Sequence, residues 1–171
     1  VFCMAKPVAL GADHGGFELK EAVKRHLEER GIEYRDFGTH TGEAVDYPDI
    51  ALPPCDAVVK GECSLALLFC GTGVGISIAA NKVNGIRACC CSDVFSAKYT
   101  RMHNDANALC MGGRVVGPGL AAGAMRAAWK SWPLLRRVSA AAIRPVKRSV
   151  SRPAGPQSLL FCEGTGAFPS V

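Results

Sequence analysis

The sequence predicts an α/β fold in which a parallel β-sheet carries helices on both faces. Short apolar segments alternate with segments of helical periodicity along the first 132 residues. The segment "SLALLFC" at residues 64–70 is almost entirely apolar, a pattern typical of a strand covered on both faces. Strands that alternate with helices at this spacing form βαβ units, and such units build a parallel sheet.

The first part of the pattern predicts a strand, a helix, a second strand and a second helix, at residues 7–12, 15–31, 33–38 and 47–62. The first strand is apolar and has a glycine, Gly11, near its end. The first helix has apolar side chains near helical spacing, and Gly31 is its expected end. The second helix contains Pro53 and Pro54, which we expect to end or kink it, because proline lacks the N–H that a helix needs.

The remaining pattern predicts three more strands, each followed by a helix. The strands are expected at residues 64–70, 86–91 and 107–112, and the helices at residues 74–85, 92–104 and 119–132. Asn84 and Gly85 are expected to close the first of these helices, and Ser92 is expected to open the next.

Length and composition predict one domain followed by a tail. The chain has 171 residues, of which 49% are hydrophobic, which is enough for a single core. From about residue 144 the sequence is rich in Pro, Ser and Gly and lacks periodicity. We therefore assign residues 1–143 to a single domain and residues 144–171 to a basic tail. Residues 106–171 hold nine Lys or Arg and one acid, so the net charge of +5 comes from this part.

Composition also argues against several classes of protein. The basic part lacks the interleaved aromatic residues of a nucleic-acid-binding surface. No apolar run reaches the roughly 18 to 20 residues that span a membrane, and the start of the chain lacks the pattern of a signal peptide. We therefore expect a cytoplasmic protein that binds neither nucleic acid nor a membrane.

The nine cysteines lie in apolar runs and form no C-x-x-C pair. This pattern favours buried thiols in a reducing compartment over a disulfide framework or a metal site. Cys89, Cys90 and Cys91 are adjacent, and we expect them to be poorly placed to pair with one another, because alternate residues of a strand face opposite ways.

Chemically active side chains follow the predicted strands. Asp13 and His14 follow the first strand, while Cys70 ends the third and is followed by Thr72. His103 lies at the end of the helix after the fourth strand. Ligands of open parallel sheets bind at the carboxyl ends of the strands, and we expect all five residues at that one edge.

The loop "GTGVG" indicates a pocket for negative charge. Glycines at positions 71, 73 and 75 let the backbone approach a ligand closely, and free N–H groups at the start of the next helix favour an anion. A cysteine at that edge would have its thiolate favoured and could take a proton from carbon. In simpler interpretations Cys70 is a core residue, His14 caps a helix, and "HND" is a polar helix end.

A nucleotide-binding module is the alternative from another class. A strand, a glycine loop, a helix, a strand and then Asp93 resemble the order of a dinucleotide-binding unit. The loop, however, is G-x-G-x-G and follows the third strand, and no Lys follows the glycines as a P-loop requires.

Four segments, "GADHGGFELK", "VDYPDIA", "CGTGVGISIAANKVNGIRA" and "SDVFSAKYTRMHNDANALCMGGRVVG", resemble the ribose 5-phosphate isomerase type B family, which also contains galactose 6-phosphate isomerase. The resemblance spans about residues 8–117. It implies a three-layer α/β/α sandwich with a five-stranded parallel, Rossmann-like sheet. It also implies a homodimer with shared active sites, although a tetramer stays open, and a reaction without metal or cofactor.

The resemblance further implies the interconversion of ribose 5-phosphate and ribulose 5-phosphate through an enediolate. Cys70 would move the proton with help from Thr72, since Ile76 stands where some relatives have a glutamate base. His103 of the partner subunit would open the sugar ring with Asp13. The loop from Gly71 through Gly73 to Gly75 would hold the enediolate oxygens. The implied binding residues are Tyr47 and Asn104 for hydroxyls, and His14, Arg114 and Arg137 for the phosphate.

The chain departs from this family after residue 117. The family's "GGRH" segment is absent, and only Arg137 matches its arginines in this part of the chain. We therefore expect weaker phosphate binding with an intact proton-transfer centre. Two alternatives stay open: a hexose 6-phosphate isomerase of the galactose or allose type, and a folded homologue whose altered C-terminus impairs catalysis.

Overall fold

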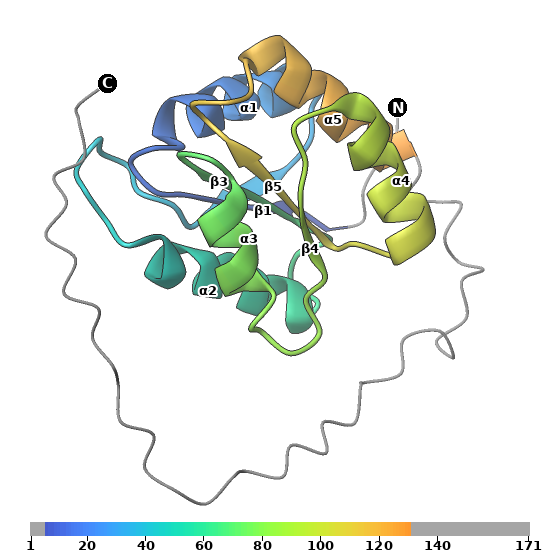
Figure 1. The fold of residues 1–171 in the computed structure, drawn as a ribbon, viewed down its shortest axis with the longest axis horizontal. Coiled ribbons are helices and arrows are strands. Elements are labelled where there is room, and N and C mark those ends of the chain that lie inside the picture. Colours follow the sequence, from blue (N-terminus) through green and yellow to red (C-terminus); the bar gives the residue numbers. More distant parts are fainter. Residues whose placement is uncertain (1–5, 131–171) are drawn as a thin grey trace, which may run out of the picture. The chain divides into compact units, whose positions relative to one another are not determined.

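The computed structural model describes residues 6–130, which form five parallel strands and five helices (Figure 1). In chain order the elements are β1 (Val8–Ala12), α1 (Phe17–Glu29), β2 (Tyr34–Asp36), α2 (Tyr47–Val59), β3 (Ala66–Cys70), α3 (Val74–Ala80), β4 (Ala88–Cys90), α4 (Val94–Asn104), β5 (Ala108–Gly112) and α5 (Pro118–Lys130). This order confirms the α/β fold. The expected domain boundary near residue 143 lies outside the described residues.

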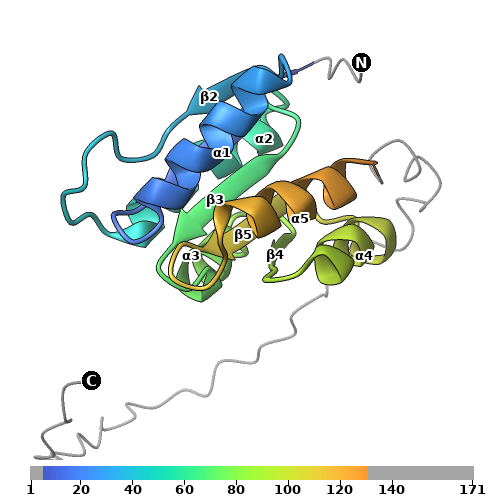
Figure 2. The ribbon, with the colours of Figure 1, turned by 90° about the horizontal axis from the view of Figure 1, so that it is seen from above.

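The sheet has the strand order β2-β1-β3-β5-β4, and every pairing is parallel. Helices α1, α4 and α5 cover one face, and α2 and α3 cover the other (Figures 1 and 2). Alternate residues of the central strands enter these two cores: Leu67 and Phe69 face the first, while Leu68 and Cys70 face the second. Because both faces are covered, the central strands β1, β3 and β5 are completely buried.

The chain leaves the neighbouring strands β1 and β3 in opposite directions. After β1 it enters α1 on one face, and after β3 it enters α3 on the other face. This arrangement is a topological switch point, at which the two connecting loops separate and leave a crevice at the carboxyl ends of the strands. The fold therefore points to the loops after β1 and β3 as the place for a ligand.

Pro53 and Pro54, which the sequence predicts to end or kink the second helix, do not end it, because α2 continues through both. Pro54 is fully buried, and a Cβ on Gly11 would lie 3.0 Å from its Cγ. Tight packing of this helix on β1 stabilises the helical backbone despite the two missing N–H donors.

Two helix boundaries also differ from the prediction. Helix α3 ends at Ala80, before the expected Asn84 and Gly85, because the Asn81 side chain bonds the Ser77 carbonyl at 2.9 Å and both backbone groups of Ala88. Helix α4 is capped by Asp93 and not by Ser92. The Asp93 carboxylate accepts a hydrogen bond from the Ser96 N–H at 2.7 Å.

The seven cysteines of the described part are all free thiols. The expectation that adjacent cysteines are badly placed to pair holds for Cys90, which faces away from its neighbours. It fails for Cys89 and Cys91, whose sulfur atoms lie 3.6 Å apart. Residues two positions apart in a strand share a face, so these two side chains meet on the side of α4.

A buried charge, which the sequence did not reveal, fixes the chain after β2. Lys20 of α1 is completely buried, and its Nζ donates to the Asp36 carboxylate at 2.8 Å and to the Thr39 carbonyl at 2.7 Å. Burial raises the pKa of Asp36, but the hydrogen bonds from Lys20 and the Gly38 N–H outweigh this effect and hold the pKa below its ordinary value. The hydrogen bonds to the Asp36 carboxylate therefore stabilise the fold above a pH of about 3.9. This stabilisation is lost as the pH falls below that value and the carboxylate is protonated.

We predict that Lys20→Met destabilises the protein by about 3 to 5 kcal/mol, because the Asp36 carboxylate and the Thr39 carbonyl lose their buried cation. Urea unfolding monitored by circular dichroism measures this loss. Lys24→Met is the matched control, since Lys24 reaches the same carboxylate at 3.2 Å but is partly exposed, and we expect it to cost about 1 kcal/mol or less. Equal losses in the two variants would contradict this account.

Candidate active site

The loops after β1 and β3 lie in direct backbone contact at the switch point. A Cβ on Gly15 would lie 2.9 Å from the Gly71 nitrogen, and one on Gly16 would lie 2.4 Å from the Phe69 carbonyl carbon. The Asp13 N–H donates to the Phe69 carbonyl at 3.2 Å. The two loops can approach this closely only because glycine has no side chain.

Cys70 is the last residue of β3, and its side chain is held inside the glycine loop. The residue is 4% exposed, and its Sγ accepts a hydrogen bond from the Gly73 N–H at 3.0 Å. Its carbonyl accepts a hydrogen bond from the Gly113 N–H at 2.8 Å. An N–H donor at this distance is placed to stabilise negative charge on the sulfur.

The glycine loop has a defined shape. Gly73 has φ of 81°, in the left-handed region that favours glycine, and it is the N-cap residue just before α3. Thr72 is exposed, and its Oγ1 accepts a hydrogen bond from the Val74 N–H at 3.3 Å. A Cβ on Gly75 would lie 3.1 Å from the Tyr47 ring, so the ring lies against the loop.

Four further side chains lie at this carboxyl edge. Asp13 is buried, and its Oδ1 accepts a hydrogen bond from the Gly16 N–H at 3.0 Å. His14 is exposed, and the Val45 N–H donates to its Nδ1 at 3.5 Å. Tyr47 begins α2 and is 40% exposed. The Arg114 guanidinium carbon would lie 3.9 Å from a Cβ on Gly71. The structure thus brings Asp13, His14, Tyr47, Cys70, Thr72 and Arg114 to one edge of the sheet.

The expectation that His103 shares this edge is wrong within a single chain. Helix α4 runs antiparallel to the strands, and its last residues lead into the amino end of β5. The Asn104 carbonyl accepts a hydrogen bond from the Arg87 Nε, just before β4, at 2.6 Å. His103 is exposed, with its ring edge-on to Tyr99 at a centroid distance of 5.0 Å. His103 and Asn104 therefore lie at the amino edge, across the sheet from Cys70.

Cys90, which the sequence analysis did not assign to the site, contacts the glycine loop. Its Sγ donates to the Thr72 carbonyl at 3.7 Å and would lie 2.9 Å from a Cβ on Gly73. The alternation of side chains along β4 was the available signal, because it directs Cys90 away from Cys89 and Cys91. Arg137, the last predicted site residue, lies outside the described residues.

The Asp93 carboxylate caps α4, so it is already engaged in the helix start. This argues against the alternative in which Asp93 binds a nucleotide. Between residues 6 and 130 no cluster of three or more His, Cys, Asp or Glu could hold a metal ion. In the same range no helix is long and apolar enough to cross a membrane.

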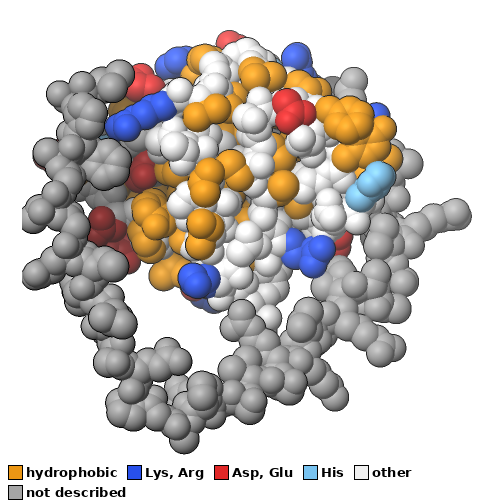
Figure 3. All heavy atoms as spheres, in the orientation of Figure 1, with side chains coloured by type: hydrophobic (Ala, Val, Ile, Leu, Met, Phe, Trp, Pro, Cys, Tyr) orange, Lys and Arg blue, Asp and Glu red, His pale blue; other side chains and the backbone are white. Residues whose placement is uncertain are grey.

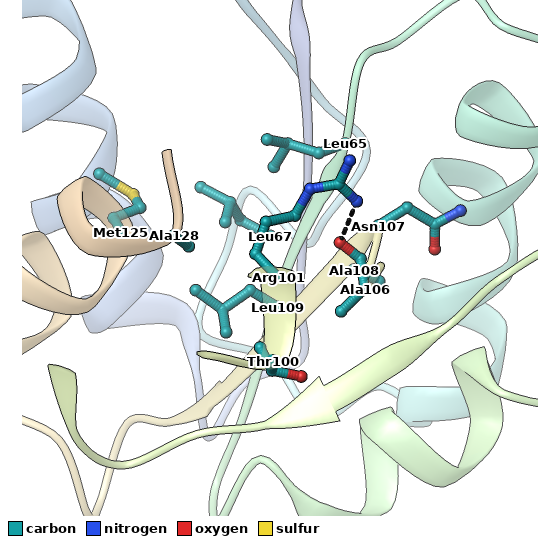
Figure 4. Close-up of a pocket in the computed structure, with 10 residues that line it drawn as sticks. All are labelled: Leu65, Leu67, Thr100, Arg101, Ala106, Asn107, Ala108, Leu109, Met125 and Ala128. Atoms are coloured by element: carbon teal, nitrogen blue, oxygen red, sulfur yellow. Dashed lines mark hydrogen bonds between the residues drawn. The ribbon is translucent and has the colours of Figure 1, made fainter. Parts of the chain in front are cut away.

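A small cavity of about 20 Å³ lies away from the candidate site (Figure 4). It is lined by apolar side chains from β3, β5 and α5, with Arg101 of α4 at its side and donating to the Ala106 carbonyl at 2.8 Å. A cavity of this volume has room for about one water molecule, so it cannot hold an organic ligand.

Comparison with known proteins identifies relatives of this chain. The sequence model of the ribose/galactose isomerase family matches residues 8–138. Ribose-5-phosphate isomerase B of Escherichia coli (strain K12) is 53% identical over 116 residues, which cover 68% of this chain and 78% of that protein. D-Erythrulose-4-phosphate isomerase 2 of Mycolicibacterium smegmatis is 43% identical over 132 residues, which cover 75% of this chain and 84% of that protein.

Solved structures share the fold. Ribose-5-phosphate isomerase B of Clostridium thermocellum superposes with a TM-score of 0.72 at 50% identity, over 73% of this chain and 84% of that one. A ribose 5-phosphate isomerase of Thermotoga maritima superposes with a TM-score of 0.73 at 41% identity, over 75% of this chain and 88% of that one. These matches confirm the resemblance and the Rossmann-like fold that the sequence indicates.

We predict that Gly73→Ala destabilises the protein by about 2 kcal/mol or more, because the left-handed backbone strains any side chain. The new Cβ would also lie 2.8 Å from the Met111 carbonyl carbon and 2.9 Å from the Cys90 sulfur. Gly117→Ala is the control, since a Cβ there meets nothing within 4 Å. Thermal unfolding of both variants measures the difference, and a Gly73 variant as stable as the control would refute this role of the loop.

Proposed function

The chain belongs to the ribose/galactose isomerase family, and we propose that it interconverts ribose 5-phosphate and ribulose 5-phosphate by proton transfer at Cys70. The observation that carries this proposal is the buried Cys70 sulfur, held 3.0 Å from the Gly73 N–H at the switch point of the sheet. A sugar bound in that crevice would present its first two carbons to the sulfur. The fold and the isomerase class follow from the family, whereas the residue roles below are part of the proposal.

Cys70 acts as the base in this mechanism. Its thiolate removes the proton from C2 of the open-chain aldose, and the electrons form an enediolate across C1 and C2. Returning the proton to C1 gives the ketose, while Thr72 assists the movement of a proton between the two oxygens. N–H groups of the loop from Gly71 to Gly75 stabilise the enediolate oxygens, a charge that develops only during the reaction.

Side chains around the crevice bind the substrate. His14, in the loop after β1, and Arg114, in the loop after β5, hold the phosphate. Arg114 lies near Gly71 and offers a forked, charge-assisted contact. Tyr47 lies against Gly75 and binds a hydroxyl group. Arg137 contributes to phosphate binding, and without the family's "GGRH" segment we propose that the phosphate is held less tightly than in relatives.

The site is completed by a second copy of the chain. His103, which opens the sugar ring together with Asp13, and Asn104, which binds a hydroxyl, lie at the amino edge of their own sheet. Only another copy can bring them to the carboxyl edge, so the active form is at least a homodimer. Figure 3 shows hydrophobic side chains exposed on one face of the molecule, which suits such an interface. The exposed apolar side chains include Ile78 of α3, which is 55% exposed, and Phe95 of α4, which is 70% exposed.

A tetrose phosphate is the second candidate substrate. Two relatives, 43% and 42% identical to this chain, are D-erythrulose-4-phosphate isomerases. Tetrose, pentose and hexose phosphates share the reacting carbons and the phosphate and differ in the distance between them. Comparing kcat/KM for D-erythrulose 4-phosphate, ribose 5-phosphate and galactose 6-phosphate would rank the three, and we expect ribose 5-phosphate to be the best.

We predict that Cys70→Ala lowers kcat for ribose 5-phosphate by about a hundredfold to ten-thousandfold, the contribution of a positioned general base. Conversion to ribulose 5-phosphate is measured in the presence of EDTA. Cys63→Ala is the matched control, because Cys63 is 3% exposed and precedes the other end of β3. If the Cys70 variant retains wild-type activity, another group is the base. If the folded wild type converts none of the sugar phosphates, the chain is an impaired homologue.

We predict that mixing two inactive variants restores activity if the site is shared. Co-expressed Cys70→Ala and His103→Ala chains would form mixed dimers in which one of the two sites has both native residues. Random pairing makes half of the dimers mixed, so about one quarter of wild-type activity is expected. Each variant expressed alone is the control, and a mixture as inactive as its parents would exclude shared sites.

A further inference from the structure

Cys89 and Cys91 form a close thiol pair on one face of β4. Their sulfur atoms are 3.6 Å apart, and a hydrogen bond runs from the Cys91 thiol to the Cys89 sulfur. Both side chains pack against the core beneath α4, on the face opposite the glycine loop. The pair therefore lies on the face of the sheet opposite Cys70 and takes no part in the proposed proton transfer.

The two thiols differ in exposure. Cys91 is 2% exposed, in the core with Ala97. Cys89 is partly exposed and lines an open pocket with Arg87, Thr100 and Asn104 at the amino end of β4. A small reagent can therefore reach Cys89 from solvent, while Cys91 is shielded from solvent.

The electrostatic surroundings of the two thiols shift their pKa values in opposite directions, and this also makes Cys89 the more reactive thiol. The hydrogen bond from Cys91 lowers the pKa of Cys89, with Thr100 adding to this effect and burial opposing it. Donating that hydrogen bond, together with burial, raises the pKa of Cys91. Near neutral pH the exposed sulfur is the nucleophile, and the buried sulfur keeps its proton.

We propose that Cys89 and Cys91 are a peroxide-reactive dithiol that closes into a reversible disulfide. The Cys89 thiolate attacks the terminal oxygen of a hydroperoxide and the O–O bond breaks, so that this oxygen stays on Cys89 as a sulfenic acid. The remaining oxygen fragment takes up a proton and leaves as water or an alcohol. The Cys91 sulfur then displaces the hydroxyl, which leaves as water with the Cys91 proton. Two thiols are oxidised by two electrons in total, the hydroperoxide is reduced, and an added dithiol reverses the change.

Closure requires a small movement that the sheet can accommodate. A disulfide bond is about 2.05 Å long, so the sulfur atoms must approach by about 1.5 Å. Strand β4 spans only Ala88–Cys90 and lies at the edge of the sheet, paired with β5 on one side. It can shift without breaking a second row of strand hydrogen bonds.

Neighbouring cysteines provide internal comparisons. Cys90 is exposed but points to the other face, where its sulfur contacts the Thr72 carbonyl, and burial together with neighbouring thiols raises its pKa. Cys110 is fully buried, and burial raises its pKa well above the ordinary value. Exposure alone would favour oxidation of Cys90, whereas the geometry of the pair favours Cys89.

The test uses the full chain, hydrogen peroxide near neutral pH, and rapid alkylation of the remaining thiols. Trypsin cleavage after Arg87 and Lys98 releases one peptide, residues 88–98, that contains all three adjacent cysteines. We expect this peptide to lack two hydrogen atoms, with only Cys90 alkylated, and to regain both thiols with dithiothreitol. We expect Cys89 to lose its free thiol at least about tenfold faster than Cys90.

Two variants sharpen the test. Cys91→Ser leaves Cys89 without its resolving thiol, so we expect a dimedone-reactive sulfenic acid at Cys89 and no disulfide within the peptide. Cys90→Ser is the matched control and should form the disulfide as the wild type does. Oxidation of Cys90 before Cys89 would overturn the proposal. So would a wild-type peptide that keeps three alkylated cysteines at peroxide concentrations that oxidise free glutathione.

Discussion

Backbone contact between glycine loops is the constraint on which the candidate site depends. A Cβ on Gly16 would lie 2.4 Å from the Phe69 carbonyl carbon, and one on Gly112 would lie 2.5 Å from the Thr72 carbonyl carbon. These contacts fix the loops after β1, β3 and β5 as one unit, because backbone cannot move aside as a flexible side chain does. Cys70 lies within this unit, so its position is set by packing and not by a network of side chains.

A buried ion pair extends this rigidity to the loop after β2. Lys20 reaches from α1 to Asp36 and to the Thr39 carbonyl, at the start of the segment that leads to Tyr47. Burying a charge is costly, and such pairs add little stability compared with apolar packing. Their directional hydrogen bonds instead fix the path of the chain. Lys20 thus positions the segment that leads to α2.

Much of this architecture could be predicted from the sequence, because apolar periodicity is a local property. All ten elements occur in the predicted order, and the residues after β1 and β3 meet as expected. The errors share one cause, which is tertiary contact that periodicity does not encode. Pro54 stays within a helix because it packs on Gly11, and Asn81 ends α3 by bonding Ala88. The burial of Lys20 and the contact of Cys90 with Thr72 have the same origin.

The position of His103 follows from the geometry of every parallel α/β sheet. A helix that connects two parallel strands must run back from the carboxyl edge to the amino edge, so its last turn always lies at the amino edge. A residue at the end of α4 therefore cannot reach the carboxyl edge of its own sheet, whatever its side chain. If the reaction needs His103 and Cys70 in one site, the fold itself requires a second copy. Assembly is then a condition of catalysis that the connection between strands imposes.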